Sequence, residues 1–329
     1  MSVEPIARSE LLKVSQICKQ FPVKEGIFRR TTQFNQAVNQ VSFSISRGET
    51  LGLVGESGCG KSTLARCIVR LHNIDSGSIS YQNRNIADLR GRELLEYRKS
   101  VQMIFQDPME SLNSRHTVGE ILAEPFVIHG IGSQSNRSIE VARLLDLVGL
   151  PQNSTNRYPF QFSGGQRQRI GIARALALNP SLIICDEAVS ALDVSIQAQI
   201  LNLLLELQEE FNLSYLFIAH DLSVVKQISN RVAVMYLGKI IETATSDSIY
   251  QHSKHPYTQS LIASIPIPDP SMRAKTNALS GEVPSAIDPP SGCVFHTRCP
   301  DAMPICSKEL PPTKIDLDGS LVNCHLYSN

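Results

Sequence analysis

Residues 55–63 combine glycines, a lysine and hydroxyls at a spacing that suits phosphate binding. Gly55, Gly60, Lys61 and Ser62 fall on the fixed positions of the pattern GxxxxGK[ST]. Glycines let backbone N–H groups turn toward an anion, and the start of a following helix adds a positive dipole. The lysine would reach the β- and γ-phosphates of a nucleotide, and the serine hydroxyl would bind Mg²⁺. The predicted phosphate-binding residues are Gly55, Glu56, Ser57, Gly58, Cys59, Gly60, Lys61, Ser62 and Thr63.

Two neighbouring carboxylates follow a short apolar run in SLIICDE, residues 181–187. A buried strand that ends in acids presents them at its carboxyl edge, where open α/β sheets bind ligands. Asp186 is suited to hold Mg²⁺ through water, and Glu187 is suited to polarise an attacking water as a general base. In isolation the Asp186-Glu187 pair is equally consistent with a surface turn and with a catalytic site. The upstream phosphate loop favours the catalytic interpretation.

A glutamine and a histidine also follow apolar, strand-like runs. Gln106 ends VQMIFQ, and its amide is predicted to touch Mg²⁺ or the attacking water. His220 ends LFIAH and is predicted to hydrogen-bond the γ-phosphate and sense its loss. Each residue alone would be an unremarkable strand-end side chain, so both predictions depend on the other motifs.

A second candidate phosphate contact lies at Ser163-Gly164-Gly165-Gln166, which reads as the start of a helix. Its glycines permit close approach to an anion, and Ser163 can both cap the helix and donate to a phosphate. One chain cannot readily close both loops on one nucleotide. The motif therefore predicts a head-to-tail dimer with ATP between the subunits. Residues 190–193 (SALD), with Asp193 at their end, are predicted to cross that interface.

The elements that would position these residues alternate between strands and helices. The alternation over 41–46 predicts a half-buried strand, and 51–54 predicts a strand that leads into the phosphate loop. Apolar residues at helical spacing over 196–211 predict one packed helix face. The other predicted elements are helices over 62–71, 117–150 and 166–178, strands over 182–185 and 216–219, and a hairpin over 232–241 around Gly238. The pattern is typical of an α/β layer with a mainly parallel sheet.

Composition narrows the class of protein. The chain has 329 residues, with 31 basic and 31 acidic side chains, and this balance gives no support to nucleic-acid binding. The cluster Lys24, Arg29, Arg30 is interpreted as a solvated loop. No apolar run has the length of a membrane span, and the N-terminus lacks a signal core. We therefore expect a cytosolic chain that reaches a membrane only through partners.

The last part of the chain differs in composition from the rest. Eleven of the 18 prolines follow residue 241, which predicts a loop-rich tail. Four of the eight cysteines lie there, spaced C-x5-C-x6-C-x17-C: Cys293, Cys299, Cys306 and Cys324. A reducing compartment argues against disulfides, and four thiolates in a segment with little core could hold a [4Fe–4S] cluster or Zn²⁺. The spacing lacks the usual C-x2-C zinc knuckle, and unligated thiols remain an alternative.

The motif set as a whole resembles the ATP-binding-cassette (ABC) ATPases over about residues 10–245. GESGCGKS, the Gln106 loop, FSGGQ, CDE, SALD and His220 occur in the family's order. The resemblance implies a P-loop NTPase fold, with a RecA-like core, an antiparallel β subdomain and a helical subdomain at about 107–165 that grips a membrane partner. It also implies that Phe21 stacks on adenine. Phe162 and Ala188-Val189 depart from the usual residues without removing a phosphate, metal or base contact.

A narrower resemblance covers nearly the whole chain. FPVKEGIFRR, HPYTQSL at 255–261 and LSGEVPSAIDPPSGCVFHTRCP at 279–300 are similar to the oligopeptide/dipeptide permease ATPases, and most similar to the F-type subunit of the pair. This similarity implies a domain at 1–245 and an extension at 246–329, and it favours iron–sulfur over zinc.

The same similarity implies a bacterial importer at the cytoplasmic face of the inner membrane. Its partners would be two transmembrane permease chains, a second ATPase that is a paralogue, and an extracytoplasmic binding protein. An importer for nickel or an oligosaccharide is an alternative, because such ATPases are alike across cargoes. A soluble ABC ATPase acting on nucleic acid is a further one, which the neutral charge disfavours.

Overall fold

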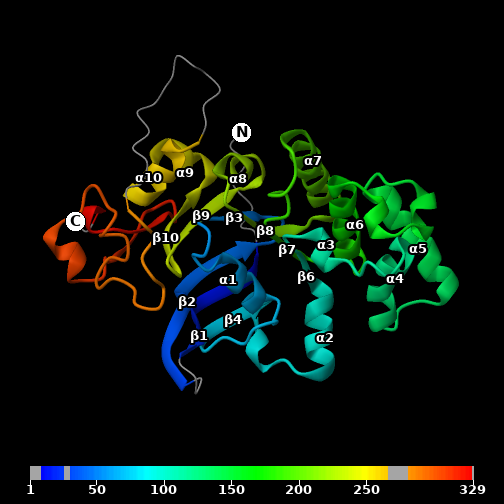
Figure 1. Ribbon diagram of the computed structural model, residues 1–329, viewed down its shortest axis with the longest axis horizontal. Helices are drawn as coiled ribbons and strands as arrows, with labels where there is room; N and C mark the ends of the chain where they lie inside the picture. Colours follow the sequence, from blue (N-terminus) through cyan, green and yellow to red (C-terminus); the bar gives the residue numbers. More distant parts are fainter. Residues whose placement is uncertain (1–8, 26–29, 266–280, 328–329) are drawn as a thin grey trace, which may run out of the picture. The chain divides into compact units, whose positions relative to one another are not determined.

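The computed structural model describes residues 9–25, 30–265 and 281–327 (Figure 1). These residues form two compact units, each assembled from separate stretches of chain. The first unit contains the chain up to Leu11, Ile45–Glu49 and Asp88–Ile218. The second unit contains Leu12–Ser44, Thr50–Ala87 and the chain from Ala219 onward. The predicted phosphate loop belongs to the second unit, and the predicted acid pair belongs to the first.

The first unit has three parallel strands in the order β8-β7-β6. They are β6 (Val101–Ile104), β7 (Leu182–Asp186) and β8 (Ser214–Ala219). Every residue of β7 is buried, which explains its unbroken apolar run, because parallel strands are covered on both faces. Ile104 pairs with Cys185, so the carboxyl ends of β6 and β7 lie at the same edge.

Among its described residues the first unit also contains six α-helices, of which α4, α5 and α6 lie together in Figure 1. Helix α7 buries Ile200, Leu203, Leu204 and Leu207, so the predicted apolar face is core packing. Asn212 ends α7 in the left-handed conformation that commonly stops a helix. The helices are α2 (Gly91–Ser100), α3 (Pro108–Ser111), α4 (Val118–Ile128), α5 (Gln134–Leu147), α6 (Gly164–Leu176) and α7 (Val194–Phe211).

The second unit contains an antiparallel sheet in the order β2-β1-β4-β5. Its strands are β1 (Glu10–Glu25), β2 (Arg30–Ser46), β4 (Ser76–Tyr81) and β5 (Arg84–Asn85). In β2 the residues Val41, Phe43 and Ile45 are buried and the serines between them are half-buried. The alternation predicted for 41–46 is therefore confirmed, as expected for a strand with one face on the core.

Five further strands of the second unit follow the order β11-β12-β10-β9-β3. Strand β3 pairs in parallel with β9, and the pairs β9–β10, β10–β12 and β12–β11 are antiparallel. Leu237 and Gly238 turn the predicted hairpin with φ values of 42° and 76°. The strands are β3 (Thr50–Val54), β9 (Arg231–Tyr236), β10 (Lys239–Thr245), β11 (Thr313–Ile315) and β12 (Leu321–Asn323).

The remaining helices of the second unit are short: α1 (Lys61–Ile68), α8 (Leu222–Ile228), α9 (Ser246–His252) and α10 (Pro256–Ala263). Helix α1 ends three residues before the predicted stop at residue 71, and the predicted helix over 117–150 is two helices with a break at 129–133. Over the described part of the chain, no helix is both long and apolar enough to cross a bilayer.

Candidate functional site

The phosphate loop connects β3 to α1 and has a backbone that only glycine adopts easily. Gly55, Gly58 and Gly60 have φ values of 155°, 79° and 108°. A Cβ on Gly60 would lie 2.0 Å from the Ala37 carbonyl oxygen, whereas a Cβ on Gly58 would meet nothing within 4 Å. The loop is therefore tightly packed from behind and open at Gly58. This cradle fits an anion approached by backbone N–H groups.

Lys61 is 4% exposed, and its ammonium group is held by the loop itself. Its Nζ donates to the carbonyl oxygens of Gly55 at 2.7 Å and Glu56 at 3.0 Å. Two carbonyl partners compensate a buried positive charge only in part, since they carry no negative charge. An incoming phosphate would supply that charge, so the geometry fits the predicted role of Lys61.

The neighbouring predicted residues are half-buried. Ser62 and Thr63 form the first turn of α1, which follows the left-handed Gly60. Phe21 lies on β1 with its ring 5.4 Å from that of His72 in an edge-on arrangement, and Lys19 Nζ lies 5.4 Å from the Phe21 centroid. The aromatic ring is partly exposed, as an adenine-stacking residue requires.

The first unit brings Gln106 and Glu187 together at the carboxyl edge of β6 and β7. Gln106 Nε2 donates to Glu187 Oε2 at 2.8 Å, and Asp186 is 3% exposed at the end of β7. Glu187 has a left-handed φ of 49°, and its backbone N–H donates to the Ile218 oxygen at 3.0 Å. The predicted general base, its amide neighbour and the buried carboxylate thus share one strand edge.

His220 immediately follows β8 and is exposed. Asp221, the next residue, caps α8 by accepting from the Ser223 N–H at 2.7 Å. Its position on an exposed strand-to-helix turn is compatible with the predicted contact to a γ-phosphate.

Ser163 caps α6, as the sequence predicted. Its Oγ accepts from the Gln166 N–H at 3.3 Å, and Gln166 Oε1 accepts from the Ser163 N–H at 3.0 Å, forming a capping box. A Cβ on Gly165 would lie 2.5 Å from Ile196 Cγ2, so this glycine is needed for packing against α7. Ser163 is exposed at the helix start, where it can also meet an anion.

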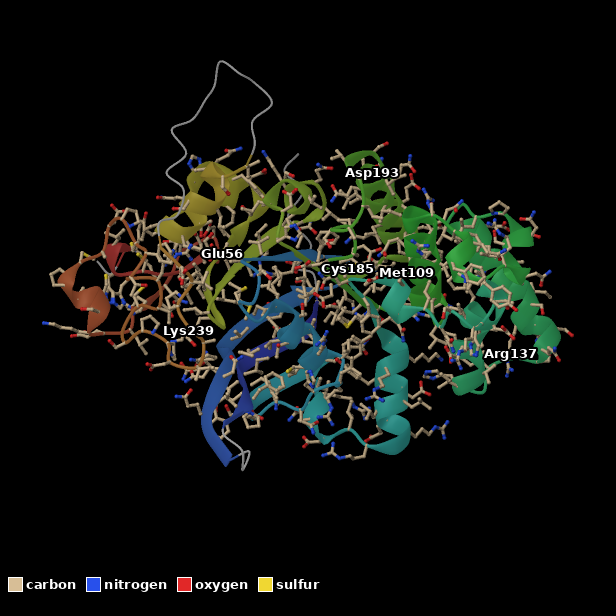
Figure 2. All side chains as sticks on the ribbon, viewed as in Figure 1. Glu56, Met109, Arg137, Cys185, Asp193 and Lys239 are labelled. Atoms are coloured by element: carbon tan, nitrogen blue, oxygen red, sulfur yellow. The ribbon has the colours of Figure 1, made fainter. Side chains whose placement is uncertain are left out.

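Asp193 caps α7 by accepting from the Ile196 N–H at 2.9 Å (Figure 2). Its side chain and that of Val194 are exposed, and Val194 is 82% accessible. An apolar residue held in solvent at the start of a helix fits the predicted intersubunit position of residues 190–193.

Two contacts to the phosphate loop come from residues that sequence reasoning missed. Arg298 Nη1 and Nη2 donate to the two carboxylate oxygens of Glu56 at 2.7 and 3.0 Å, and the Tyr257 hydroxyl accepts from the Glu56 N–H at 3.0 Å. Tyr257 and Arg298 lie in the HPY and HTRCP stretches. The similarity of those stretches to the peptide-permease ATPases can be recognised in the sequence, but their proximity to the phosphate loop cannot.

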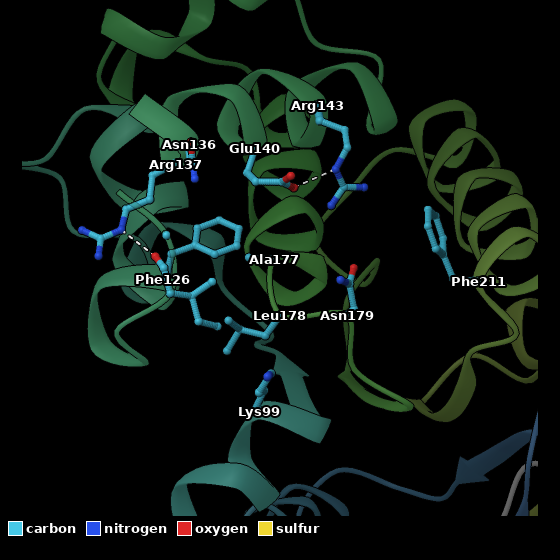
Figure 3. Close-up of a pocket in the computed structure, with 12 residues that line it drawn as sticks. Lys99, Phe126, Asn136, Arg137, Glu140, Arg143, Ala177, Leu178, Asn179 and Phe211 are labelled. Atoms are coloured by element: carbon cyan, nitrogen blue, oxygen red, sulfur yellow. Dashed lines mark hydrogen bonds and ion pairs between the residues drawn. The ribbon is translucent and has the colours of Figure 1, made fainter. Parts of the chain in front are cut away.

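A groove of about 730 Å³ lies in the first unit among α4, α5 and the ends of α6 and α7 (Figure 3). Phe126 and Phe211 give it apolar walls, and Lys99, Arg137 and Arg143 give it a cationic rim. Arg143 Nε pairs with Glu140 at 2.8 Å. The rim has more positive than negative side chains, so it suits an acidic, partly apolar segment.

The four tail cysteines are free thiols, of which Cys293, Cys306 and Cys324 are buried and Cys299 is half-buried. Burial raises the pKa values of Cys293 and Cys324, and it raises that of Cys299 to about 11. Within the described ranges, no three His, Cys, Asp or Glu side chains are arranged to hold a metal ion. The predicted cluster therefore stays a prediction.

Comparison with protein families gives two matches. Residues 38–190 match the ABC transporter family, and residues 241–306 match the oligopeptide/dipeptide transporter C-terminal region. The chain is 52% identical to the oligopeptide transport ATP-binding protein AppF of Bacillus subtilis, over 97% of this chain and 98% of that protein. It is 51% identical to OppF of Salmonella typhimurium, over 92% of each.

Solved structures agree with the family matches. The dimeric ATP-binding cassette MJ0796, in a post-hydrolysis state bound to ADP and Pi, superposes with a TM-score of 0.64 at 29% identity, covering 72% of this chain and 99% of that chain. CbiO1 of Clostridium perfringens, part of the ABC transporter complex cbiONQ, gives 0.63 at 25% identity, over 74% of this chain and 91% of that chain.

Proposed function

This chain belongs to the ABC transporter family and is an ATPase with the P-loop ABC fold, and we propose that it powers uptake of oligopeptides or dipeptides through partner permease subunits. The family requires ATP with Mg²⁺. The ATPase activity rests on the phosphate loop, because its open Gly58 and buried Lys61 suit a nucleotide phosphate. The match of 241–306 to the oligopeptide transporter C-terminal region supports the transport part.

The proposed roles in hydrolysis follow the chemistry of each side chain. Lys61 binds the β- and γ-phosphates, and Phe21 stacks on adenine. Ser62, Gln106 and Asp186 hold Mg²⁺, a hard cation that prefers oxygen ligands and neutralises phosphate charge when bound.

Glu187 accepts the proton of the attacking water, with its carboxylate oriented by the Gln106 amide at 2.8 Å. His220 hydrogen-bonds the γ-phosphate and responds when it leaves. Of the residues named here, only Glu187 moves a proton, and the others bind the nucleotide or its Mg²⁺.

Ser163 and the N-terminus of α6 are proposed to bind a nucleotide held by a second ATPase subunit. An exposed, capped helix start offers N–H donors to an anion. Asp193 would lie across the same interface. ATP binding then closes the dimer and hydrolysis reopens it, so that binding energy drives a conformational change in the partners. We propose a paralogous ATPase as the second subunit.

The permease partners are proposed to dock on the groove between α4, α5 and the ends of α6 and α7. Its cationic rim of Lys99, Arg137 and Arg143 would pair with acidic residues on a cytoplasmic permease segment, and Phe126 and Phe211 would contact its apolar face. This attachment would hold the chain peripherally at the cytoplasmic face of the inner membrane.

The four tail cysteines are proposed to bind a [4Fe–4S] cluster, with Zn²⁺ as the alternative. Thiolate ligands suit both, and the four cysteines share the loop-rich tail. Anaerobic purification followed by absorption spectroscopy and iron, sulfide and zinc analysis tests this assignment. A metal content below one equivalent in a folded anaerobic sample would contradict it.

Purification of this chain from native membranes in mild detergent tests the transport function. The expected companions are two multi-span permease chains and a second ATPase, after which the associated binding protein can be screened for peptides. A binding protein that takes nickel or an oligosaccharide would change the cargo. Ribosomes or nucleic acid as the companions would overturn the transport assignment and leave the ATPase chemistry intact.

A further inference from the structure

The C-terminal extension holds the phosphate loop through the second residue of that loop. Glu56, labelled in Figure 2, has its carboxylate gripped by the Arg298 guanidinium in a two-point ion pair at 2.7 and 3.0 Å. Its backbone N–H donates to the Tyr257 hydroxyl, and its carbonyl accepts from Lys61. The backbone and side chain of Glu56 are thus both fixed, and two of these contacts come from residues beyond the cassette motifs.

Arg298 is buried where the extension packs against β9. Its side chain is 5% exposed, compared with 26% for Glu56. Nη1 also lies 3.4 Å from the Tyr236 hydroxyl, and Tyr236, Tyr257 and Phe295 pack their rings together with centroids 4.7 to 5.3 Å apart. Because these rings already restrict the Arg298 side chain, it loses little conformational freedom when it pairs with Glu56. A bidentate arginine–carboxylate pair is a strong, directional contact.

The charge of Glu56 gives this contact a consequence for nucleotide binding. The loop must accept polyanionic phosphates, and a carboxylate within the loop repels them. Arg298 neutralises that charge and hydrogen-bonds both carboxylate oxygens. Lys61 and the backbone N–H groups of the loop can then bind phosphate without repulsion from Glu56. Without Arg298, the carboxylate would be unpaired and free to turn toward the phosphates.

We propose that Arg298 is a positioning residue for ATP binding, through which the C-terminal extension sets the nucleotide affinity of the phosphate loop. Arg298 lies between Cys293 and Cys299, and its N–H donates to the Phe295 oxygen. Cys293 N–H donates to the Cys306 oxygen at 2.7 Å. The segment that carries two of the four cysteines therefore also carries the residue that neutralises the loop.

The test uses the purified full-length chain and a fluorescent, non-hydrolysable ATP analogue. Because the inference requires nucleotide to bind at this loop, wild type and Lys61→Ala are compared first. If wild type binds the analogue and Lys61→Ala does not, the phosphate loop is the nucleotide site. If the two proteins bind equally, the analogue does not bind at this loop, and the proposed nucleotide site is refuted together with the role of Arg298. Arg298→Ala should then bind about tenfold more weakly, the scale of a hydrogen-bonded charge pair. Lys308→Ala, an exposed cation of the same extension, should match wild type.

A second variant separates electrostatics from folding. In Glu56→Gln/Arg298→Ala the unpaired carboxylate is gone, so affinity should recover to within about threefold of wild type, less than the tenfold loss expected for a charged pair. The loss in Arg298→Ala should also grow at low ionic strength, because salt screens the repulsion between Glu56 and the phosphates. A purely structural role for Arg298 predicts neither effect.

Two results would overturn the proposal. One is Arg298→Ala binding within twofold of wild type, and the other is a double variant that binds as weakly as the single one. If Arg298→Ala does not fold, Arg298→Gln decides, because it removes the positive charge and keeps a long hydrogen-bonding side chain. A folded Arg298→Gln with weakened binding supports the proposal, and binding within twofold of wild type refutes it.

Discussion

Glu187 shows how the backbone and a neighbour fix one functional side chain. Its φ of 49° is a conformation that costs a non-glycine residue about 1–3 kcal/mol. The hydrogen bond from its N–H to Ile218 and that from Gln106 to its carboxylate hold it there. Strain that persists under such restraint is typical of a residue whose direction matters for function.

Glu187→Gln is expected to keep ATP binding and to lose at least about 100-fold in turnover, because a positioned general base contributes on this scale. The amide is similar in shape but cannot take the proton of water. Steady-state phosphate release and analogue binding measure the two quantities. Glu209→Gln, on the exposed side of α7, is the matched control and should hydrolyse ATP at the wild-type rate. Equal turnover in Glu187→Gln would refute the base assignment.

At the scale of elements, helix caps serve both folding and the site. Ser163 at the start of α6 and Ser133 at the start of α5 each accept from the N–H three residues on at 3.3 Å, and both are exposed. Their hydroxyls make the same cap hydrogen bond, and α6 has in addition the bond from the Ser163 N–H to Gln166 Oε1. The proposed function gives only Ser163 a phosphate partner.

Ser163→Ala and Ser133→Ala should therefore each cost about 1 kcal/mol of stability, the usual value of a serine cap. Only Ser163→Ala should lower ATP turnover at saturating ATP, by about tenfold or more, because it also loses a hydrogen bond to charged phosphate. Urea unfolding and phosphate release provide the comparison. Equal turnover in the two variants would remove Ser163 from the nucleotide site.

Helix α10 is capped by a histidine whose burial makes the stability of the fold depend on pH. His255 is 1% exposed, its Nδ1 accepts from the Tyr257 N–H at 3.0 Å, and burial lowers its pKa from 6.5 to about 4. Between these values the unfolded chain binds a proton that the folded chain does not. This contribution to stability is therefore full above pH 6.5 and is lost as pH falls toward 4.

Relative to His255→Asn, which keeps a capping acceptor, wild type should lose about 2 kcal/mol more stability between pH 7 and pH 5. Urea unfolding of both proteins across this range measures the difference. Parallel pH profiles for the two would show that His255 is not the group that titrates.

For the whole molecule, the groove between α4, α5 and the ends of α6 and α7 connects the ATPase to its proposed partners. Arg137→Glu/Arg143→Glu should abolish co-purification with the permease chains while the affinity for the ATP analogue stays within about twofold, because charge reversal at a complementary surface costs several kcal/mol. Arg92→Glu, an exposed arginine of α2, is the control and should retain the partners. Retention of the permease by the double variant would move the docking surface elsewhere.

Local sequence patterns were sufficient to predict most of the secondary structure and the types of residue that could do chemistry. Apolar periodicity predicted β2 and α7, because it follows directly from which face of an element is buried, and an unbroken apolar run predicted β7, which is buried on both faces. The glycines of the phosphate loop, the acid pair and the α6 cap were readable because each depends on neighbouring residues only. The division at residues 245/246 stays a prediction.

Only the tertiary structure brought distant residues into contact. Gln106 and Glu187 are 81 positions apart, and Glu56 and Arg298 are 242 apart. Their meeting depends on which strands pair and how the extension packs on β9 and β10, and no local pattern encodes either. A carboxylate in the loop and an arginine in the tail are ordinary residues in the sequence. Packing alone makes them a pair, because it buries Arg298 where Glu56 is its available counter-charge.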